Sequence, residues 1–243
     1  IPPLPLGVCV AETQGSIGYM VQQSLQNVLK EKKIDREVVT LITQTIVDKN
    51  DPSINDPQKF IGRRYGKTEA QSLARQFNWT IKEQEPGNWR QVVPSPMPQF
   101  IEHGRSIQTL VDNGTIVIAS GGGGIPTFWN DDHKLEGLNA VIDKDLSAAL
   151  LGRVIKSEEL WIITDLDQVC LNFGKSNEQP LLKITLDEAQ KYFDEGHFQE
   201  GSMGPKIRAA MYFLKHHGKK VIITSIAGVL GAINGSNGTT ITK

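Results

Sequence analysis

TIVIASGGGGIP, at residues 115–126, is the stretch that decides the fold. Its first half is a short β-branched run, which is typical of a buried strand. Gly121, Gly122, Gly123 and Gly124 follow directly, and a backbone without side chains can turn freely and present N–H groups to an anion. Ligands of open parallel sheets bind at the carboxyl ends of the strands. We therefore expect an anion or phosphate site at this turn rather than a flexible linker.

Helices and strands alternate on both sides of the glycine turn. The residue patterns predict helices over 14–33, 107–113, 143–151, 186–195 and 205–217, and strands over 38–47, 115–120, 160–164, 221–225 and 239–242. This alternation indicates βαβ units and a mostly parallel sheet with helices on both faces. We therefore predict an α/β fold in which residues 1–243 form one domain.

Residues from about 56 to 98 interrupt this alternation. They are polar, rich in Lys, Arg and Gln, and end in PSPMP at residues 94–98. A short helix is predicted over 68–77, and apolar residues alternate around Trp79 and Trp89. Because a loop of this length without structure of its own would be unusual, we expect a small inserted subdomain that projects from the main sheet, with a lid as one possible role.

The composition excludes several classes of protein. Of the 243 residues, 39% are hydrophobic and 22% are charged, as in soluble globular proteins. A formal net charge of -1 gives no general attraction to nucleic acid or to an anionic membrane, and no stretch approaches the ~20 apolar residues of a membrane span. Cys9 and Cys170 have no metal-ligand spacing. We expect reduced, buried thiols in a cytoplasmic protein that has no protein-borne metal site.

Two lysines stand at predicted helix starts, where a cation opposes the helix dipole by ~0.3–1 kcal/mol. Lys144 lies between Asp143, a suitable N-cap, and Asp145 in the first turn. Lys206 follows Pro205, which favours the first helical position. Together with the glycine turn, these lysines indicate phosphoryl transfer, in which lysines neutralise the moving group. A solvated surface lysine remains the alternative interpretation of Lys144.

The other familiar catalytic motifs are absent from the sequence. No GxxxxGK[ST] loop occurs, no GxGxxG fingerprint follows a first strand, and the five histidines have no partner pattern for nucleophilic catalysis. Thr164 and Asp165 end a predicted strand. They either line a nucleotide pocket or cap the next turn, and the residues alone leave both interpretations open.

Seven stretches, in order along the chain, form a combined signature. They are ETQGSIGY (12–19), VDKNDP (47–52), WRQVVPSP (89–96), GGGGIP (121–126), AVIDKDL (140–146), NFGK (172–175) and GHFQEGSMGPK (196–206). Together they closely resemble the carbamate kinases, a branch of the amino acid kinase superfamily. The likeness runs from about residue 4 to residue 243, and its order and spacing are far more specific than any one motif.

The resemblance implies a three-layer αβα sandwich with a mostly parallel central sheet and a small protruding subdomain. It also implies reversible phosphoryl transfer between ATP and carbamate, giving ADP and carbamoyl phosphate and usually run towards ATP. Lys144 and Lys206 would stabilise the transferring phosphoryl group, and Asp145 would orient both lysines. The four glycines would cradle the carbamate and phosphate end, and Lys59 would belong to the subdomain that closes over the substrate.

The resemblance extends to the nucleotide and to assembly. Thr164, Asp165 and the segment up to Met203 would border ATP or ADP, Mg²⁺ would arrive with the nucleotide, and the protein would be a homodimer built across its first helix and neighbouring elements. Two alternatives remain for the function. One is another phosphotransferase of the superfamily, and the other is a catalytically silent scaffold.

Two departures from the family pattern concern the subdomain and the start of the chain. The family usually has KPIGP where this chain reads KFIGR at residues 59–63, so the local turn is expected to differ. The family's GGNA and HGNGP motifs, each at the end of a strand, are not found in this sequence. We therefore expect that an N-terminal segment is missing, and that a chain starting at Ile1 does not turn over.

Overall fold

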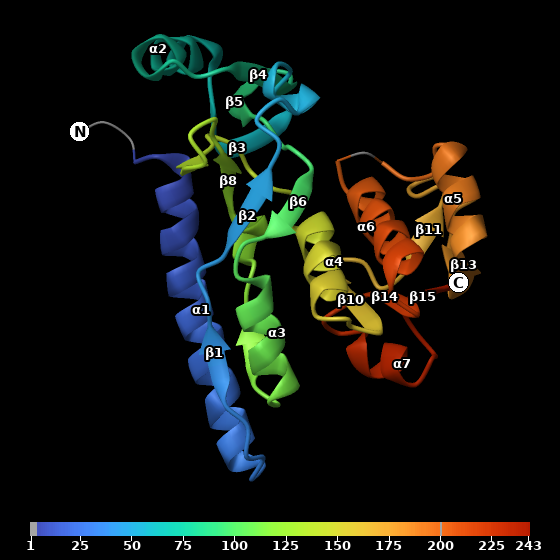
Figure 1. Cartoon of the computed structure of the whole chain (residues 1–243). Coiled ribbons are helices and arrows are strands. Elements are labelled where there is room, and N and C mark those ends of the chain that lie inside the picture. Colours follow the sequence, from blue (N-terminus) through green and yellow to red (C-terminus); the bar gives the residue numbers. More distant parts are fainter. Residues whose placement is uncertain (1–3, 200) are drawn as a thin grey trace. The chain divides into compact units, whose positions relative to one another are not determined.

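The computed structural model describes residues 4–199 and 201–243, which form two compact units divided between Lys144 and Asp145. Ile1, Pro2 and Pro3, where the sequence begins, and Glu200, within the GHFQEGSMGPK stretch, lie outside the described residues. Each unit combines helices with strands (Figure 1), which confirms the α/β prediction. Among the described residues, none of the helices has the length and apolar character that a membrane crossing requires.

The first unit holds a long helix, two small groups of strands and a separate three-stranded sheet. Its elements are α1 (Leu6–Glu31), β1 (Val38–Thr40), β2 (Gln44–Val47), β3 (Lys59–Tyr65), α2 (Lys67–Phe77), β4 (Ile81–Glu85), β5 (Asn88–Val93), β6 (Pro98–Ile101), α3 (Gly104–Asp112), β7 (Ile116–Ile118), β8 (Ile125–Trp129) and β9 (Leu135–Gly137), with 3₁₀ turns at Pro52–Ile54 and Gly121–Gly123. β1 pairs with β7 in parallel, whereas β2 lies between parallel β8 and antiparallel β6. β8 and β9 form an antiparallel hairpin that the sequence patterns did not predict.

Helix α1 begins at Leu6 rather than at residue 14, because the chain contains no proline between Pro5 and the predicted start. It packs closely on β1. A Cβ added to Gly18 would lie 2.2 Å from the Thr40 methyl group. The predicted strand 38–47 is divided into β1 and β2, since the buried Gln14 side chain accepts from the Thr43 N–H at 2.9 Å and donates to the Thr43 carbonyl at 3.2 Å. This exchange ties the helix to the break between the two strands.

Residues 59–93 form an antiparallel sheet in the order β3, β5, β4, with α2 between β3 and β4 in the chain. The rings of Tyr65, Phe77 and Trp79 lie together, with centroids 5.4 and 6.4 Å apart in the two contacts that Trp79 makes. The strand pairing of β3 shifts register after Ile61, and Gly62 has a φ of 67°. The stretch interpreted as an insertion thus has a sheet, a helix and an aromatic cluster of its own.

The second unit is built around one mixed sheet. Its elements are α4 (Lys144–Val154, whose first residue ends the first unit), β10 (Glu159–Thr164), β11 (Val169–Leu171), β12 (Gln179–Leu181), β13 (Lys183–Thr185), α5 (Leu186–Asp194), α6 (Met203–His216), β14 (Lys220–Ser225), α7 (Val229–Ile233) and β15 (Thr239–Thr242). The strand order is β10, β14, β15, β13, with β14 and β15 antiparallel and the other two pairs parallel. β11 and β12 form a separate hairpin.

The core of the second unit lies where α6 packs beside β10 and β14. Phe213 is fully buried, and a Cβ added to Gly152 would lie 2.8 Å from its ring. The predicted helices 186–195 and 205–217 and strands 221–225 and 239–242 correspond to α5, α6, β14 and β15. β11, β12, β13 and α7 were not predicted, because strands of three residues and a helix of five are too short to show a periodic pattern.

Candidate active site

The glycine turn joins β7 to β8 and is held from one side by β2. Gly123 and Gly124 have φ values of 98° and 88°, which favour glycine. A Cβ would lie 2.7 Å from the Ile142 carbonyl oxygen at Gly123 and 2.2 Å from Thr45 Oγ1 at Gly124. The Thr45 hydroxyl also donates to the Gly123 carbonyl at 2.8 Å. The second half of the turn therefore requires glycine for both conformation and space.

The first half of the turn is more open. A Cβ on Gly122 would meet nothing within 4 Å, and one on Gly121 would meet the Gln14 side chain at 3.1 Å. Within the described residues, the N–H groups of Gly121 and Gly122 donate no hydrogen bond, whereas those of Gly123 and Gly124 bond back to Ser120 and Gly121. Two N–H donors are thus available to an anion, as an anion-binding turn requires.

Lys59 is the first residue of β3, and its side chain points to the segment before α4. Its Nζ lies 3.6 Å from Asp143 Oδ2, with exposed side-chain fractions of 42% for Lys59 and 13% for Asp143. Asp143 directly precedes the first residue of α4, the position that was predicted for the N-cap. Its neighbour Ile142 packs on Gly123, so Asp143 lies next to the glycine turn.

Lys206 and Asp145 form a buried pair in the second unit. Lys206 Nζ donates to Asp145 Oδ2 at 3.0 Å, and their side chains are only 12% and 10% exposed. Asp145 lies in the first turn of α4, directly after Lys144. The carboxylate that sequence analysis linked to Lys206 thus contacts it. A cation shielded from water in this way acts more strongly on a nearby anion than an exposed one does.

The start of α6 differs from the prediction. The helix begins at Met203, so Pro205 is its third residue rather than its first, and Lys206 is the fourth, at the end of the first turn where it was predicted. Proline is tolerated there because the first four N–H groups of a helix have no partner within the helix. Ser202 precedes the helix without a capping hydrogen bond from its side chain.

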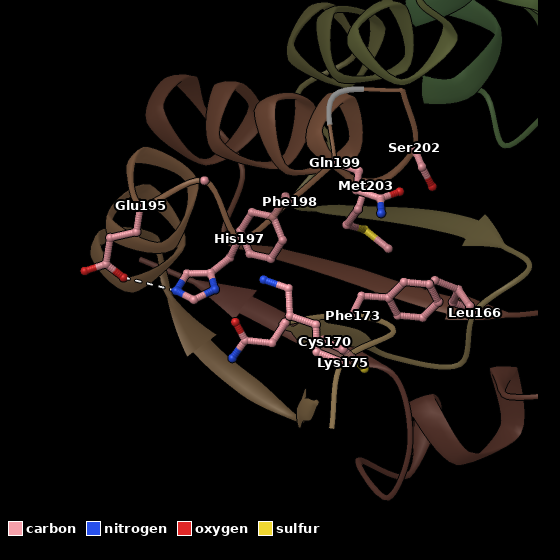
Figure 2. Close-up of a pocket in the computed structure, with 12 residues that line it drawn as sticks. Leu166, Cys170, Phe173, Lys175, Glu195, His197, Phe198, Gln199, Ser202 and Met203 are labelled. Atoms are coloured by element: carbon pink, nitrogen blue, oxygen red, sulfur yellow. Dashed lines mark ion pairs between the residues drawn. The ribbon is translucent and has the colours of Figure 1, made fainter. Parts of the chain in front are cut away.

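A cavity of about 370 Å³ lies in the second unit (Figure 2). It is lined by Leu166, Cys170, Asn172, Phe173, Lys175, Glu195, Gly196, His197, Phe198, Gln199, Ser202 and Met203. Of the three residues expected to border a nucleotide, Met203 lines this cavity. Thr164 and Asp165 are not among the described lining residues, and the Thr164 hydroxyl donates to Asp165 Oδ1 at 2.9 Å. Mixed apolar and polar walls of this kind suit an organic ligand that has a polar end.

All twelve lining residues belong to the segment from Thr164 to Met203 that the resemblance assigned to the nucleotide, although Met203 was the only one of them predicted by itself. Phe173 and Lys175 were part of the NFGK stretch, and His197 was part of GHFQEGSMGPK, so only the motifs marked them. His197 Nε2 lies 3.3 Å from Glu195 Oε2 at one end of the cavity (Figure 2). Burial raises the pKa of the Cys170 thiol, and Glu178 raises it further. The cavity therefore contains a thiol that stays protonated at neutral pH.

The predicted residues fall into two groups, one in each unit. The glycine turn and the Lys59–Asp143 pair lie in the first unit, and the Lys206–Asp145 pair and the cavity lie in the second. No group of three or more His, Cys, Asp or Glu side chains that could hold a metal ion occurs among the described residues. Free N–H groups and lysines can bind anions and neutralise a phosphoryl group in transfer.

Comparison with known proteins identifies relatives of the whole chain. A model of the amino acid kinase family matches residues 23–225. A carbamate kinase from Pyrococcus horikoshii is 44% identical over 242 residues, which cover 100% of this chain and 77% of that protein. A carbamate kinase 2 from Staphylococcus epidermidis is 44% identical over 241 residues, covering 99% of this chain and 78% of the relative. The structure of a Giardia lamblia carbamate kinase bound to AMP-PNP superposes with a TM-score of 0.91 at 42% identity, covering 100% of this chain and 77% of that one.

Proposed function

The chain belongs to the amino acid kinase family and, within it, to the carbamate kinases, and on this basis we propose how its residues carry the reaction. It is an ATP-dependent phosphotransferase that acts between ATP and carbamate. The observation that carries the proposal is the buried pair of Lys206 and Asp145, 3.0 Å apart. We propose that the reaction runs mainly towards ATP, from carbamoyl phosphate and ADP.

Lys206 and Lys144 stabilise the phosphoryl group during transfer. Charge spreads over the equatorial oxygens of that group in the transition state, so a fixed cation lowers the barrier more than a mobile one. Asp145 fixes Lys206 through the 3.0 Å contact. Because Asp145 directly follows Lys144 in the chain, the same carboxylate serves to orient both lysines.

The glycine turn and Lys59 bind the acyl phosphate. The available N–H groups of Gly121 and Gly122 bind its anionic oxygens, and Gly123 and Gly124 give the turn its shape. Lys59, on the sheet of residues 59–93, supplies a cation from the protruding subdomain. This arrangement places the substrate's charge on two backbone donors and one lysine.

We assign the nucleoside part of ADP or ATP to the cavity of the second unit, because its walls combine apolar and polar groups. Leu166, Phe173 and Met203 offer apolar and aromatic surface to the base. Thr164, the last residue of β10, and Asp165, which follows it, border the phosphate side. Mg²⁺ would come with the nucleotide and would supply positive charge against its phosphates.

Three finer features of the family belong to the same proposal. The sheets form a three-layer αβα sandwich with a mostly parallel central sheet, and a second copy of the chain covers α1 to form a homodimer. The homodimer is supported by the exposed apolar side chains of α1, which are Val8, Ile17, Tyr19, Met20, Val21 and Val28. A cytoplasmic location is the third, in keeping with two cysteines that form no disulfide.

Formation of ATP tests the function. Protein expressed from the complete reading frame that contains this sequence is mixed with ADP, Mg²⁺ and carbamoyl phosphate, and ATP is measured with luciferase. Acetyl phosphate, an acyl phosphate with a methyl group in place of the amino group, is the matched control. We expect ATP from carbamoyl phosphate and far less from acetyl phosphate, whereas the reverse preference would contradict the proposal. The ratio of kcat/KM in the two directions tests the preference for ATP synthesis.

A further inference from the structure

We propose that Asp143 competes with the substrate for Lys59, holding the lysine beside the glycine turn until an acyl phosphate displaces the carboxylate. The inference rests on the proposed function, because it assumes that Lys59 meets the anionic substrate. Asp143 is then a positioning residue that sets how readily Lys59 leaves the carboxylate for the substrate. Asp143 therefore affects the affinity of the protein for the acyl phosphate.

The contact between Lys59 and Asp143 is built to be exchanged. At 3.6 Å it is longer than the roughly 2.7–2.9 Å of a charge-assisted hydrogen bond. The Lys59 side chain is 42% exposed, so water and salt can reach it when the pair separates. Asp143 is mostly covered, with 13% of its side chain exposed. The mobile partner is therefore the lysine.

The backbone of Lys59 is fixed, so the exchange needs only a movement of its side chain. Lys59 pairs with the buried Val93 across β3 and β5. Arg90 secures the following turn, because its guanidinium donates to the Gly62 carbonyl at 2.8 Å and to the Ile61 carbonyl at 3.4 Å. The ammonium group moves on a flexible four-carbon stem.

The destination of Lys59 lies beside its present position. Ile142 packs against Gly123, so its neighbour Asp143 is adjacent to the turn whose N–H groups on Gly121 and Gly122 have no acceptor among the described residues. A phosphate group carries about −1.5 to −2 charge at pH 7, and a carboxylate carries one. An acyl phosphate at this turn therefore attracts Lys59 more strongly than Asp143 does.

The sign of the effect on KM tests the proposal. Replacing Asp143→Asn removes the competing charge while keeping a residue that suits the position before a helix. Because water screens the lysine of this pair, which is 42% exposed, the KM for carbamoyl phosphate should fall by only up to about fivefold. If Asp143 instead holds Lys59 in its productive position, KM will rise, and the proposal is wrong. Asp143→Ser provides the same test should the Asn variant fold poorly.

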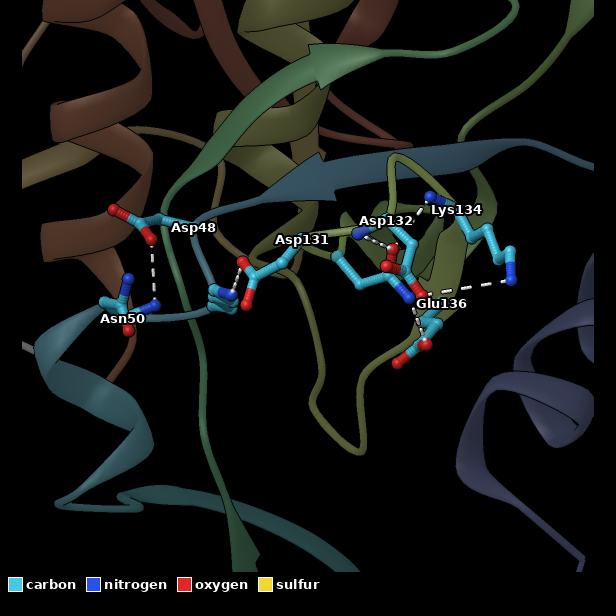
Figure 3. Close-up of polar contacts among 8 residues, drawn as sticks. Asp48, Asn50, Asp131, Asp132, Lys134 and Glu136 are labelled. Carbon is cyan, nitrogen blue, oxygen red and sulfur yellow. Dashed lines mark hydrogen bonds and ion pairs between the residues drawn. The ribbon is translucent and has the colours of Figure 1, made fainter.

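Asp131→Asn is the matched control (Figure 3). Asp131 pairs with Lys49 at 2.6 Å on the exposed surface of the same unit, with 94% of its side chain exposed. The variant removes one carboxylate from a lysine pair by the same substitution, and we expect KM to stay unchanged. In a Lys59→Ala background, Asp143→Asn should no longer lower KM. A decrease that persists there would assign the effect to general charge repulsion and overturn the proposal.

Labelling of Lys59 tests the exchange without turnover. Acylation by acetic anhydride, mapped by mass spectrometry, should be faster at Lys59 in Asp143→Asn than in the wild type, and inorganic phosphate should protect Lys59 at lower concentration in the variant. Equal labelling and equal protection would contradict the proposal. If the wild type makes no ATP, the proposed function fails by that result, while the labelling still decides whether phosphate draws Lys59 from Asp143.

Discussion

Each unit of this molecule holds a lysine against a carboxylate, but in different surroundings. In the first unit Lys59 lies 3.6 Å from Asp143 and is 42% exposed. In the second unit Lys206 lies 3.0 Å from Asp145, and the two side chains are 12% and 10% exposed. Water screens the first pair, which is worth about 0–1 kcal/mol. Breaking a buried pair such as the second costs about 3–5 kcal/mol.

The difference shows how one pair of residue types serves two tasks. A cation that must capture a substrate anion has to be able to leave its carboxylate, and the exposed pair of the first unit allows this. A cation that must act in the transition state gains from being fixed before the reaction. The buried pair of the second unit provides that fixed charge. The exposed fraction of each lysine thus indicates which task it performs.

The largest effect is expected from breaking the buried pair. Asp145→Asn leaves Lys206 with an uncompensated buried charge, so the free energy of unfolding should fall by about 3–5 kcal/mol. Urea denaturation followed by circular dichroism measures this change. Asp131→Asn, at an exposed pair, should change stability far less, because water and salt screen that pair. Equal effects in the two variants would contradict the distinction between the pairs.

The glycine turn beside the exposed pair should tolerate little change at its buried end. Gly124→Ala places a Cβ 2.2 Å from Thr45 Oγ1 at a φ of 88°. Overpacking and backbone strain together should destabilise the protein by on the order of 3 kcal/mol. Gly137→Ala is the control, since its Cβ would meet nothing within 4 Å. The midpoint temperatures of thermal unfolding of the two variants test this prediction. A Gly124→Ala protein as stable as the control would refute the role of close packing.

Lys59→Ala separates capture from chemistry. Loss of one charged contact to the substrate is worth about 1.5–3 kcal/mol, so the KM for carbamoyl phosphate should rise roughly 10- to 100-fold, with a smaller change in kcat. Raising the ionic strength should increase the wild-type KM in the same direction, because Lys59 is exposed to salt. Steady-state kinetics at two salt concentrations measure both effects. A variant that loses kcat but keeps its KM would contradict the assignment.

Asp51 is a third carboxylate to compare with Asp143 and Asp145, because it accepts hydrogen bonds from backbone N–H groups instead of pairing with a lysine. Burial acts to raise its pKa, but hydrogen bonds from Ser53 and from the Met97 N–H at 3.0 Å lower it below the usual value. Since the unfolded pKa is about 3.9, the resulting stability is present above roughly pH 4 and is lost as the pH falls through the folded pKa. Asp51→Asn should therefore be less stable than the wild type at pH 6, and the gap should close in acid. A gap that does not depend on pH would count against this account.

Local patterns were sufficient to predict the main helices and strands and the glycine turn. The β-branched run before the turn, the helix α5 and the strand β14 each have a periodic pattern that does not depend on distant residues. The split of the predicted strand 38–47 depends instead on Gln14, which reaches Thr43 from a helix 29 positions away in sequence. No pattern within the strand itself contains that contact.

The candidate site shows the same division. Lys144, Asp145 and Lys206 were recognisable because a lysine at a helix start is electrostatically unusual. Asp143 was predicted only as an N-cap, and its contact with Lys59 crosses 84 positions of the chain, from residue 59 to residue 143. Pro205 was placed at the wrong helical position because its preference covers several early positions. Contacts between segments that are distant in the sequence can be identified only from the folded structure.

The kinetics of Lys206→Ala test the central claim most directly. ATP formation from ADP and carbamoyl phosphate is measured for the wild type and the variant, both expressed from the complete reading frame and checked for folding by circular dichroism. Removing a fixed group that stabilises the transition state lowers kcat by about 10²- to 10³-fold. We predict a loss of this size with little change in the KM for carbamoyl phosphate. A folded variant that keeps the wild-type kcat would contradict the claim that the buried lysine stabilises the phosphoryl group in transfer.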